Sequence, residues 1–236
     1  PAAADPDGLV GVGGALTPAL LLRAYADGVF PWFNDDDPVL WWSPDPRAVI
    51  ELDDLHVSRR LARTMRSGKF RTTANAAFEA VMRGCAENRP EGTWVTDEMI
   101  RGYCALHAAG HAHSIEVWGV RDTPPPPFEF GPPPTTREEW DRDVERINLH
   151  HWEIVGGIYG VAVGGLFAGE SMFHRRTDAS KVALVTLVER LKAQKFDLFD
   201  VQMTTEHTER MGAKNIPRAD YLRRLHAAVR RTDVRF

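Results

Sequence analysis

The chain has 236 residues, of which 43% are hydrophobic and 26% charged, values typical of one globular unit or one unit with a small companion. This composition excludes a disordered polymer, a collagen-like fibre and a coiled-coil rod. The two cysteines are too few for a disulfide framework or a four-thiolate zinc site. No apolar run is long enough to span a membrane, and the apolar stretch 8–22 lacks the basic leader of a signal peptide. We therefore expect a cytoplasmic protein without a membrane segment.

Charge is distributed unevenly along the chain. The net charge is −4, from 29 lysines and arginines against 33 acidic residues. Residues 1–54 carry ten acids and two bases, whereas residues 56–71 carry six bases and no acid. The overall charge argues against non-specific coating of nucleic acid, but the short basic segment can hold one stretch of phosphate backbone.

The first 46 residues predict a small helical unit followed by a rigid platform. Thr17 is expected to cap a helix with Pro18 at its first position, and Asp27-Gly28 to end it. The segments VFPWF and VLWWSP, on either side of the acidic turn 35–37, are rich in proline and aromatic residues and predict tight extended structure.

The rest of the chain predicts an α+β fold, with helices layered on a mostly antiparallel sheet. The expected strands are residues 48–52, the first part of 70–86, 114–118, 154–173 with a hairpin turn at Gly164-Gly165, and 196–202. The expected helices are residues 58–66, with Arg59, Arg63 and Arg66 on one face, a helix ending near Ala86, one capped by Thr96 that runs to His107, and 178–192. The proline-rich, charged stretch 119–153 predicts an excursion from a hairpin.

Three polar residues on apolar strands are candidates for chemistry. Asp200 and Gln202 share one face of a strand by the two-residue period, so the carboxylate could orient the amide, which could then position a nucleophile. The alternative is that both are solvated strand-end residues. Glu170 follows Gly169 at the end of an apolar strand, and a buried carboxylate there needs partners.

The four tryptophans Trp32, Trp41, Trp42 and Trp94 allow two interpretations. They can belong to the core, or they can stack on a purine or an unpaired nucleotide. The neighbouring basic segment favours stacking for some of them.

Common catalytic and metal motifs are missing from the sequence. His107, His111 and His113 are interrupted by Gly110 and lack a metalloprotease spacing, so no metal is expected, and His150-His151 is expected at the surface. There is no phosphate-binding loop of the NTPase type and no Gly-x-Ser-x-Gly. The segment HRRTDASK could bind an anion at a helix N-terminus, but it lacks the glycines of acyl-CoA acetyltransferases.

Several long and compositionally unusual segments resemble the leucyl/phenylalanyl-tRNA–protein transferase family. They include LLRAYADGVFPWF, LWWSPDPRAV, GTWVT, VGGIYGVAVGGLFAGESMF, ASKVAL, and FDLFDVQMTTEH followed by MGAKNIPR. They occur in the family's order from about Leu9 to Leu225 and cover nearly everything except residues 119–153. Thr205, where some members carry Asn, departs from the family pattern.

The resemblance implies a fold, an activity and partners. It implies a small N-terminal domain, residues 1–46, joined to an acetyltransferase-like (GNAT-like) catalytic domain, residues 47–236, that contains the insert 119–153. Such an enzyme transfers leucine or phenylalanine from charged tRNA to the α-amino group of a protein with N-terminal Arg or Lys, which marks that protein for degradation by the N-end rule. It is expected to be a monomer without a cofactor.

The resemblance also assigns roles to individual residues. Asp200 and Gln202 match the pair proposed to activate the acceptor amine. Trp32, Trp94 and Glu170 match contacts of the aminoacyl-adenosine. Ile158, Phe167, Leu184 and Phe199 match the pocket for the apolar side chain. We expect Arg59, Arg60, Arg63 and Arg66 to hold acceptor-stem phosphates.

Two other functions remain open from the sequence. An acyl-CoA-dependent N-acetyltransferase is compatible with the expected domain but needs a glycine-rich pyrophosphate loop. A non-catalytic tRNA-binding module would use the basic helix and the tryptophans without needing Asp200 or Gln202.

Overall fold

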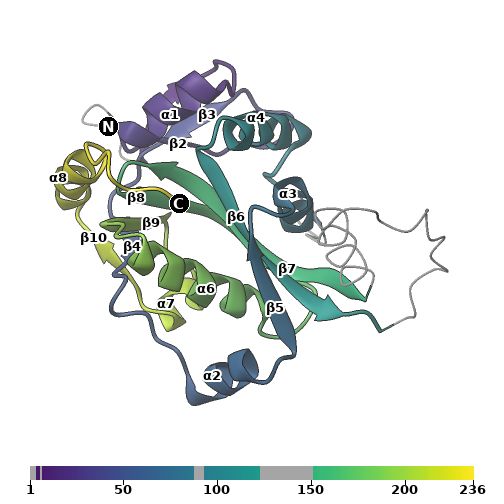
Figure 1. Ribbon diagram of the computed structural model, residues 1–236. Helices are drawn as coiled ribbons and strands as arrows, with labels where there is room; N and C mark the ends of the chain where they lie inside the picture. The colour runs from purple at the N-terminus through teal and green to yellow at the C-terminus, as the bar shows by residue number, and fades with distance from the viewer. Residues whose placement is uncertain (1–3, 6, 88–92, 123–150) are drawn as a thin grey trace.

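Two β-sheets and their helices make up the computed structural model, which describes residues 4–5, 7–87, 93–122 and 151–236 (Figure 1). The large sheet has seven strands in the order β10-β4-β9-β8-β7-β6-β5, and the small sheet has three in the order β1-β3-β2. In the described chain, neighbouring strands of the large sheet pair antiparallel except β8 and β9, which are parallel. The predicted α+β class with a mostly antiparallel sheet is confirmed.

The centre of the large sheet is the hairpin of β7 (Trp152–Val163) and β8 (Leu166–His174). The predicted turn at Gly164-Gly165 joins them, with Gly164 at a φ of 57°. A Cβ on Gly164 would lie 2.7 Å from the carbonyl oxygen of Ala228, so this turn needs glycine for space as well as for conformation. On the other side β7 pairs with β6 (Ala112–Val120), up to Val120 opposite Trp152. The stretch 119–153 therefore interrupts a hairpin, as predicted, although residues 123–150 lie outside the described residues.

Helices cover both faces of the large sheet. On one face, α3 (Phe78–Ala86) and α4 (Asp97–Ala108) pack over Tyr159. On the other face, α6 (Ala179–Ala193) packs over its neighbour Ile158. Because successive residues of a strand point to opposite faces, β7 supplies both cores at once. The predicted stripe Val182, Val185 and Val188 is buried, and so are leucines between its members, so α6 is buried around much of its circumference.

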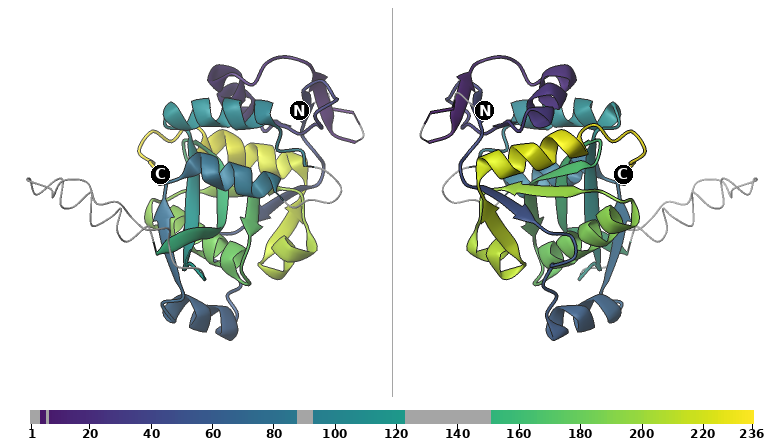
Figure 2. Two further views of the ribbon diagram at one scale, coloured as in Figure 1. Left: turned by 90° about the vertical axis from the view of Figure 1, so that its right-hand side faces the viewer. Right: turned by 90° about the vertical axis from the view of Figure 1, so that its left-hand side faces the viewer.

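The N-terminal residues pack onto the α3–α4 face. They form β1 (Leu9–Val12), α1 (Pro18–Ala26), β2 (Phe30–Pro31) and β3 (Leu40–Trp42). Leu21 and Tyr25 of α1 belong to the same apolar cluster as Tyr103 of α4, and Gly102 lets the backbone of Leu16 approach α4 closely. The small sheet lies at the end of the molecule opposite to α2 (Arg59–Arg66) (Figure 2).

The remaining elements complete the edges of the large sheet. They are β4 (Arg47–Ile50), β5 (Phe70–Ala74), β9 (Leu198–Gln202), α7 (Glu206–Arg210), β10 (Ala213–Ile216) and α8 (Arg218–Ala228). The two expected helix caps are confirmed, because the side-chain oxygens of Thr17 and Thr96 accept hydrogen bonds from backbone N–H groups three residues on. Ser58 caps α2 in the same way. No helix in the described ranges is long and apolar enough to cross a membrane.

Candidate active site

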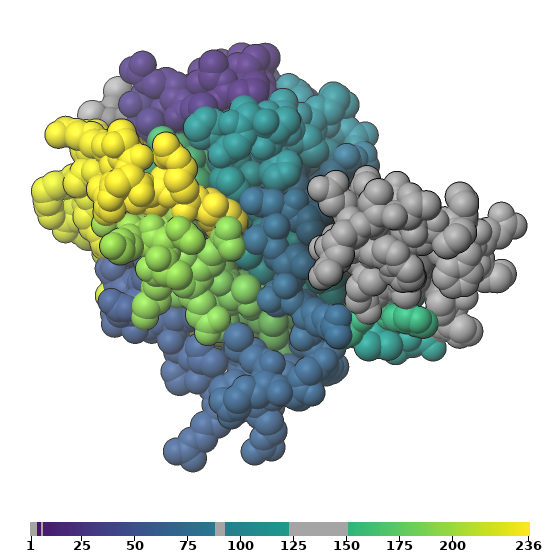
Figure 3. Space-filling view, in the orientation of Figure 1, coloured from purple at the N-terminus to yellow at the C-terminus, as the bar shows by residue number. Residues whose placement is uncertain are grey.

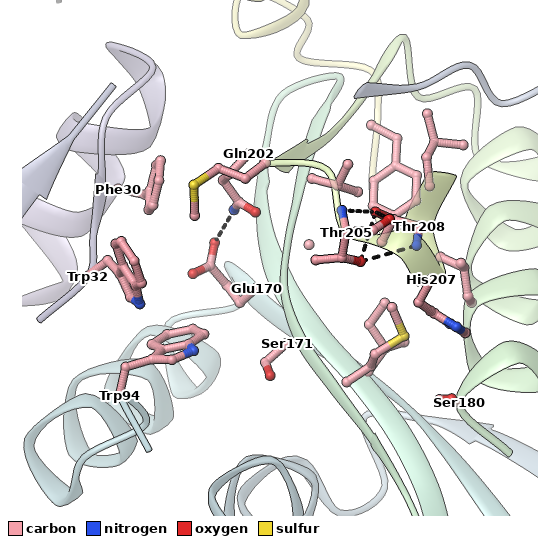
Figure 4. Close-up of a pocket in the computed structure, with 18 of the residues that line it drawn as sticks. Phe30, Trp32, Trp94, Glu170, Ser171, Ser180, Gln202, Thr205, His207 and Thr208 are labelled. Carbon is pink, nitrogen blue, oxygen red and sulfur yellow. Dashed lines mark hydrogen bonds between the residues drawn. The ribbon is translucent and has the colours of Figure 1, made fainter. Parts of the chain in front are cut away.

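A pocket of about 510 Å³ lies where the parallel strands β8 and β9 stop pairing (Figure 4). Their register runs from Leu166 opposite Leu198 to Ala168 opposite Asp200. The residues that follow on each strand, 169–172 and 201–203, line the pocket. Beyond this point the facing edges of β8 and β9 are not paired with each other, so both strands present side chains to the same space.

Apolar side chains form one part of the pocket wall. Ile158, Leu184 and Phe199, which the resemblance assigns to an apolar pocket, all line it. The sequence did not single out Met172 and Met203, which also line it. Phe167 lies elsewhere: it is 1% exposed and its ring packs edge-on against Phe199 at 6.0 Å between centroids. Phe167 thus supports the wall from behind and does not form its surface.

Aromatic side chains form a second part of the wall. Phe30, Trp32 and Trp94 face the pocket from β2, the following loop and the approach to α4 (Figure 4). Trp32 remains 40% exposed, and Trp42 Nε1 donates a hydrogen bond of 2.7 Å to its backbone oxygen. Trp41 is a core residue whose Nε1 donates to the Gly13 oxygen. Both interpretations of the tryptophans therefore apply: Trp32 and Trp94 line the pocket, and Trp41 and Trp42 pack against other residues.

Asp200 lies beneath the pocket, completely buried and hydrogen-bonded at both oxygens. Arg47 donates from Nε to Oδ1 at 2.9 Å and from Nη2 to Oδ2 at 2.7 Å. Tyr221 OH donates to Oδ2 at 2.8 Å, and the backbone N–H of Gln202 donates to Oδ1 at 2.9 Å. Burial opposes the charge on Arg47, but Asp200 offsets this and raises the pKa of the guanidinium. Asp200 is thus placed to fix the chain at Gln202 through its backbone.

Gln202 leaves extended geometry and turns its side chain toward Glu170. Its φ is 58°, a left-handed value that non-glycine residues rarely adopt. Its Nε2 donates a hydrogen bond of 2.9 Å to Oε1 of Glu170, drawn as a dashed line in Figure 4. The expected coupling of Asp200 to Gln202 is present, but it runs through the backbone, while Glu170 holds the amide. The two-residue strand period does not describe this last position.

Glu170 is half-buried in the pocket wall, at one end of a hydrogen-bonded chain that continues through two tyrosine hydroxyl groups. Tyr103 OH donates to Oε2 at 3.3 Å and is itself hydrogen-bonded to Tyr25 OH. Burial raises the pKa of Glu170 to about 8, and the charge of Asp200 adds to the rise, while the hydrogen bonds of the tyrosines and the charge of Arg47 oppose it. A carboxyl group that titrates near neutral pH therefore faces the pocket.

The sequence reasoning missed four residues of this network, namely Arg47, Tyr221, Tyr25 and Tyr103. Arg47 opens an apolar strand, and a charged side chain that is buried with such a strand needs a partner. The tyrosines lie on apolar helix faces, and a tyrosine in such a position needs a hydrogen-bond partner when it is buried.

At the far end of the pocket, Thr205 has a structural task. Its Oγ1 accepts a hydrogen bond from the backbone N–H of Thr208 at 3.2 Å and so caps α7. Asn is also a favoured residue at such a cap, so either residue could close the first turn of α7. His207 of α7 also lines the pocket, and burial lowers the pKa of its imidazole.

The basic helix α2 stands out from the surface (Figure 3). Arg59, Arg60, Arg63 and Arg66 are all exposed, as expected. Arg60 donates to Asp178 at 2.8 Å, at the start of α6 and two residues before Ser180 of the pocket. The other three arginines form no ion pair with any residue that the structure describes. The pocket and the basic helix are therefore linked through the first turn of α6.

The candidate histidines have structural partners. The Nδ1 of His107 lies 2.7 Å from the Ala112 oxygen, and its ring stacks on Phe78. His113 is buried and its Nδ1 lies 3.1 Å from the Asn75 amide nitrogen. His151 is exposed, and His150 lies outside the described residues. Within the described ranges no three His, Cys, Asp or Glu side chains are grouped to hold a metal ion.

The fold and the pocket together define a class of protein. An apolar recess that ends on a carboxylate–amide pair, beside two tryptophans, is typical of an α+β enzyme that holds an apolar group next to a polar reacting centre. The family model described as leucyl/phenylalanyl-tRNA protein transferase matches residues 49–123 and 144–226, and that of the family's N-terminal domain matches residues 14–45. The chain belongs to the leucyl/phenylalanyl-tRNA–protein transferase family.

Individual relatives agree with this assignment. The leucyl/phenylalanyl-tRNA–protein transferase of Anaeromyxobacter sp. (strain Fw109-5) is 47% identical over 238 residues, which cover 100% of this chain and 88% of that protein. The enzyme of the same name from Solidesulfovibrio magneticus is 46% identical over 231 residues, covering 97% and 81%. Among solved structures, FemX is similar with a TM-score of 0.47 and 12% identity, covering 73% of this chain and 60% of FemX.

Proposed function

We propose that this chain transfers leucine or phenylalanine from charged tRNA to the α-amino group of a protein that begins with Arg or Lys, and so marks that protein for N-end-rule degradation. The observation that carries the proposal is the pocket, where an apolar wall, two tryptophans and the Glu170–Gln202 pair meet in one space. Family membership supports it, since the relatives are named for this transfer. The enzyme acts as a cytoplasmic monomer.

Different residues of the pocket bind different parts of the donor substrate. Ile158, Leu184 and Phe199 receive the apolar side chain of the amino acid, and Phe167 keeps the ring of Phe199 in place. Trp32 and Trp94 stack on the terminal adenosine, because an indole face binds an unpaired base by stacking. An apolar pocket distinguishes side chains by about 1–3 kcal/mol per methylene, so neighbouring apolar amino acids react slowly.

The reaction starts from an ester that is already activated, so the protein's task is to align two substrates and stabilise the developing charge. Asp200 fixes the backbone of Gln202, and the Gln202 side-chain oxygen accepts a hydrogen bond from the acceptor amine. Gln202 is the catalytic residue of the predicted pair, and Asp200 is its positioning residue, since its oxygens are engaged with Arg47 and Tyr221.

The basic helix extends the site toward the body of the tRNA. Arg59, Arg63 and Arg66 bind acceptor-stem phosphates, and Arg60 ties the helix to α6 through Asp178. Phosphate contacts position a nucleic acid without reading its sequence, so this helix serves tRNAs charged with either amino acid.

The domain division belongs to the same proposal. We place a small N-terminal domain at residues 1–46 and an acetyltransferase-like, GNAT-like domain at 47–236. A separate family match over residues 14–45 supports the boundary. The pocket uses both parts, because Phe30 and Trp32 come from the first and Glu170 and Gln202 from the second.

The experiment is transfer of labelled leucine from leucyl-tRNA to a peptide that begins with Arg. A peptide with acetylated N-terminal Arg is the matched control. Label on the free peptide alone supports the aminoacyltransferase with the α-amine as acceptor. If the protein binds tRNA but neither peptide is labelled, it is a binding module. If the free peptide is labelled when labelled acetyl-CoA replaces leucyl-tRNA, the protein is an N-acetyltransferase.

A further inference from the structure

We propose that Glu170, and not Asp200, accepts the proton of the acceptor's α-ammonium group, with Gln202 holding both in place. This inference rests on the proposed function, whose reaction needs a free amine, while an N-terminal amino group is largely protonated at neutral pH. The enzyme therefore needs a proton acceptor at the pocket.

The surroundings of Asp200 argue against it as that acceptor. Its side chain is 1% exposed, and each oxygen already accepts two hydrogen bonds, from Arg47, Tyr221 and the Gln202 backbone. A bidentate arginine stabilises the ionised carboxylate and makes protonation unfavourable. An arriving proton would find neither a route nor a free lone pair.

Glu170 has the opposite surroundings. It lines the pocket between Trp32, Trp94 and Gln202 and remains accessible from it (Figure 4). One oxygen accepts from Gln202 Nε2 at 2.9 Å and the other from Tyr103 OH at 3.3 Å. Each oxygen of a carboxylate can accept about two hydrogen bonds, so both keep capacity for an ammonium group.

The Glu170–Gln202 contact also orients the amide of Gln202. An ionised carboxylate accepts hydrogen bonds and donates none, so it selects the amide nitrogen of Gln202 and leaves the amide oxygen turned away from it. That oxygen can accept a second hydrogen bond from the same ammonium group. One ammonium can thus be held by Gln202 while it gives a proton to Glu170.

The acid strength of Glu170 suits this exchange. Burial raises its pKa to about 8, and Asp200 adds to the rise, against Tyr25, Tyr103 and Arg47. An N-terminal ammonium has a pKa of about 7.7–8.0, so the proton passes between matched groups. A glutamate of ordinary pKa, about 4.3, would disfavour the transfer by roughly three to four powers of ten.

The atoms of the step balance without another reagent. An N–H bond of the ammonium breaks and its proton goes to the Glu170 carboxylate. The nitrogen lone pair then attacks the ester carbonyl carbon, and the bond from that carbon to the ribose oxygen breaks. The departing oxygen takes the second proton of the nitrogen, which leaves an amide, a free tRNA hydroxyl and one proton on Glu170 for release to solvent.

The test is the pH profile of single-turnover transfer from leucyl-tRNA to the Arg peptide, in the wild type and in Glu170→Gln. The wild-type rate should pass through a maximum near pH 8, because the step starts from an ammonium group bound to an ionised Glu170, and above this pH fewer acceptors carry the proton that forms this contact. Glu170→Gln should be about 100-fold slower at pH 8, where the wild-type rate is at its maximum, and its rate should rise to a plateau as the free amine forms in solution. The deficit should shrink at least tenfold by pH 9.5.

Two variants keep the test decisive. Glu170→Asp retains a carboxylate and should keep the maximum at a lower rate, and it replaces Glu170→Gln if that variant does not fold. Glu116→Gln is the matched control, because Glu116 is a buried carboxylate held by Thr73 and Ser114 on β5 and β6 and does not line the pocket. Its profile should have the wild-type shape.

The outcomes separate this inference from the proposed function. No wild-type transfer at any pH overturns the proposed function. Wild-type transfer with a Glu170→Gln profile of unchanged shape, merely scaled down, overturns the assignment of Glu170 and leaves it as a contact of the aminoacyl-adenosine.

Discussion

Two sets of arginines in this molecule show how burial changes what one residue type does. Arg47 is 1% exposed, held against Asp200 by two hydrogen bonds and packed over the rings of Phe30 and Tyr221. Arg59, Arg63 and Arg66 of α2 are exposed and form no ion pair with the described residues. The first arrangement fixes a geometry that water cannot disturb, and the second leaves charge available to a partner.

Removing Arg47 should give the largest effect. Arg47→Ala leaves the carboxylate of Asp200 buried without its cation, so the free energy of unfolding should fall by about 3–5 kcal/mol. Urea titration of the purified variant measures it. Arg224→Ala removes a half-exposed bidentate partner of Glu51 and should cost far less. Equal losses in the two variants would contradict the distinction between buried and exposed pairs.

Gln202→Ala should act on the reaction while affecting stability little. Loss of the amide that orients the amine should slow transfer about 100-fold, equivalent to about 2.7 kcal/mol. Affinity for leucyl-tRNA, measured by filter binding, should stay within about twofold, because phosphate contacts on α2 are untouched. Glu209→Ala, at an exposed position of α7 that does not line the pocket, serves as the control for local disruption. A large loss of tRNA affinity in Gln202→Ala would show that Gln202 binds the donor tRNA and does not orient the amine.

The raised pKa of Glu170 predicts a pH-dependent stability difference. In the unfolded chain Glu170 ionises near pH 4.3, whereas in the folded chain it keeps its proton until about pH 8. The ionised unfolded state is therefore favoured as pH rises, and Glu170 lowers stability progressively between these values. Glu170→Gln should gain about 1–3 kcal/mol relative to the wild type from pH 5 to pH 8. Parallel urea titrations at both pH values check this, and a difference that does not change with pH would contradict the raised pKa.

The exposed arginines should give the smallest effect on the protein itself. Arg63→Ala with Arg66→Ala should weaken leucyl-tRNA binding about tenfold and lower the salt dependence of binding by about one to two ions. The free energy of unfolding should change by less than about 0.5 kcal/mol. Arg83→Ala with Arg223→Ala is the control, since both lie on other helices and pair with Glu79 and Asp220. An unaltered salt slope in the α2 variant would place the phosphates elsewhere.

Local signals in the sequence predicted most of the elements. Thr17 and Thr96 cap helices through bonds to residues three positions away, and Gly164 turns the central hairpin. The β-branched and aromatic residues of the segment 154–173 indicated its strands. In each case the interacting residues are close neighbours in the sequence, so a short segment is enough to predict the element.

The candidate site was predictable as a set of residues but not as a set of contacts. Two apolar strands singled out Asp200, Gln202 and Glu170. The resemblance selected Trp32 and Trp94 from the four candidate tryptophans, and all five residues lie at or beneath one pocket. The resemblance also named Phe167, which the packing places one layer behind the surface. Which member of an apolar strand faces a cavity depends on where pairing between β8 and β9 ends, and no local pattern indicates that point.

The sequence by itself determined the class of fold, the helix ends, the basic helix and the family, because these depend on residue order and short-range bonds. The tertiary structure decided which charges are paired. Arg47 and Asp200 lie 153 positions apart, and Tyr25 reaches Glu170 through Tyr103, 78 positions further along the chain. Burial raises the pKa of Glu170 and shields the ion pair of Arg47 and Asp200 from water. These groups become buried only when strands and helices from distant parts of the sequence pack around them.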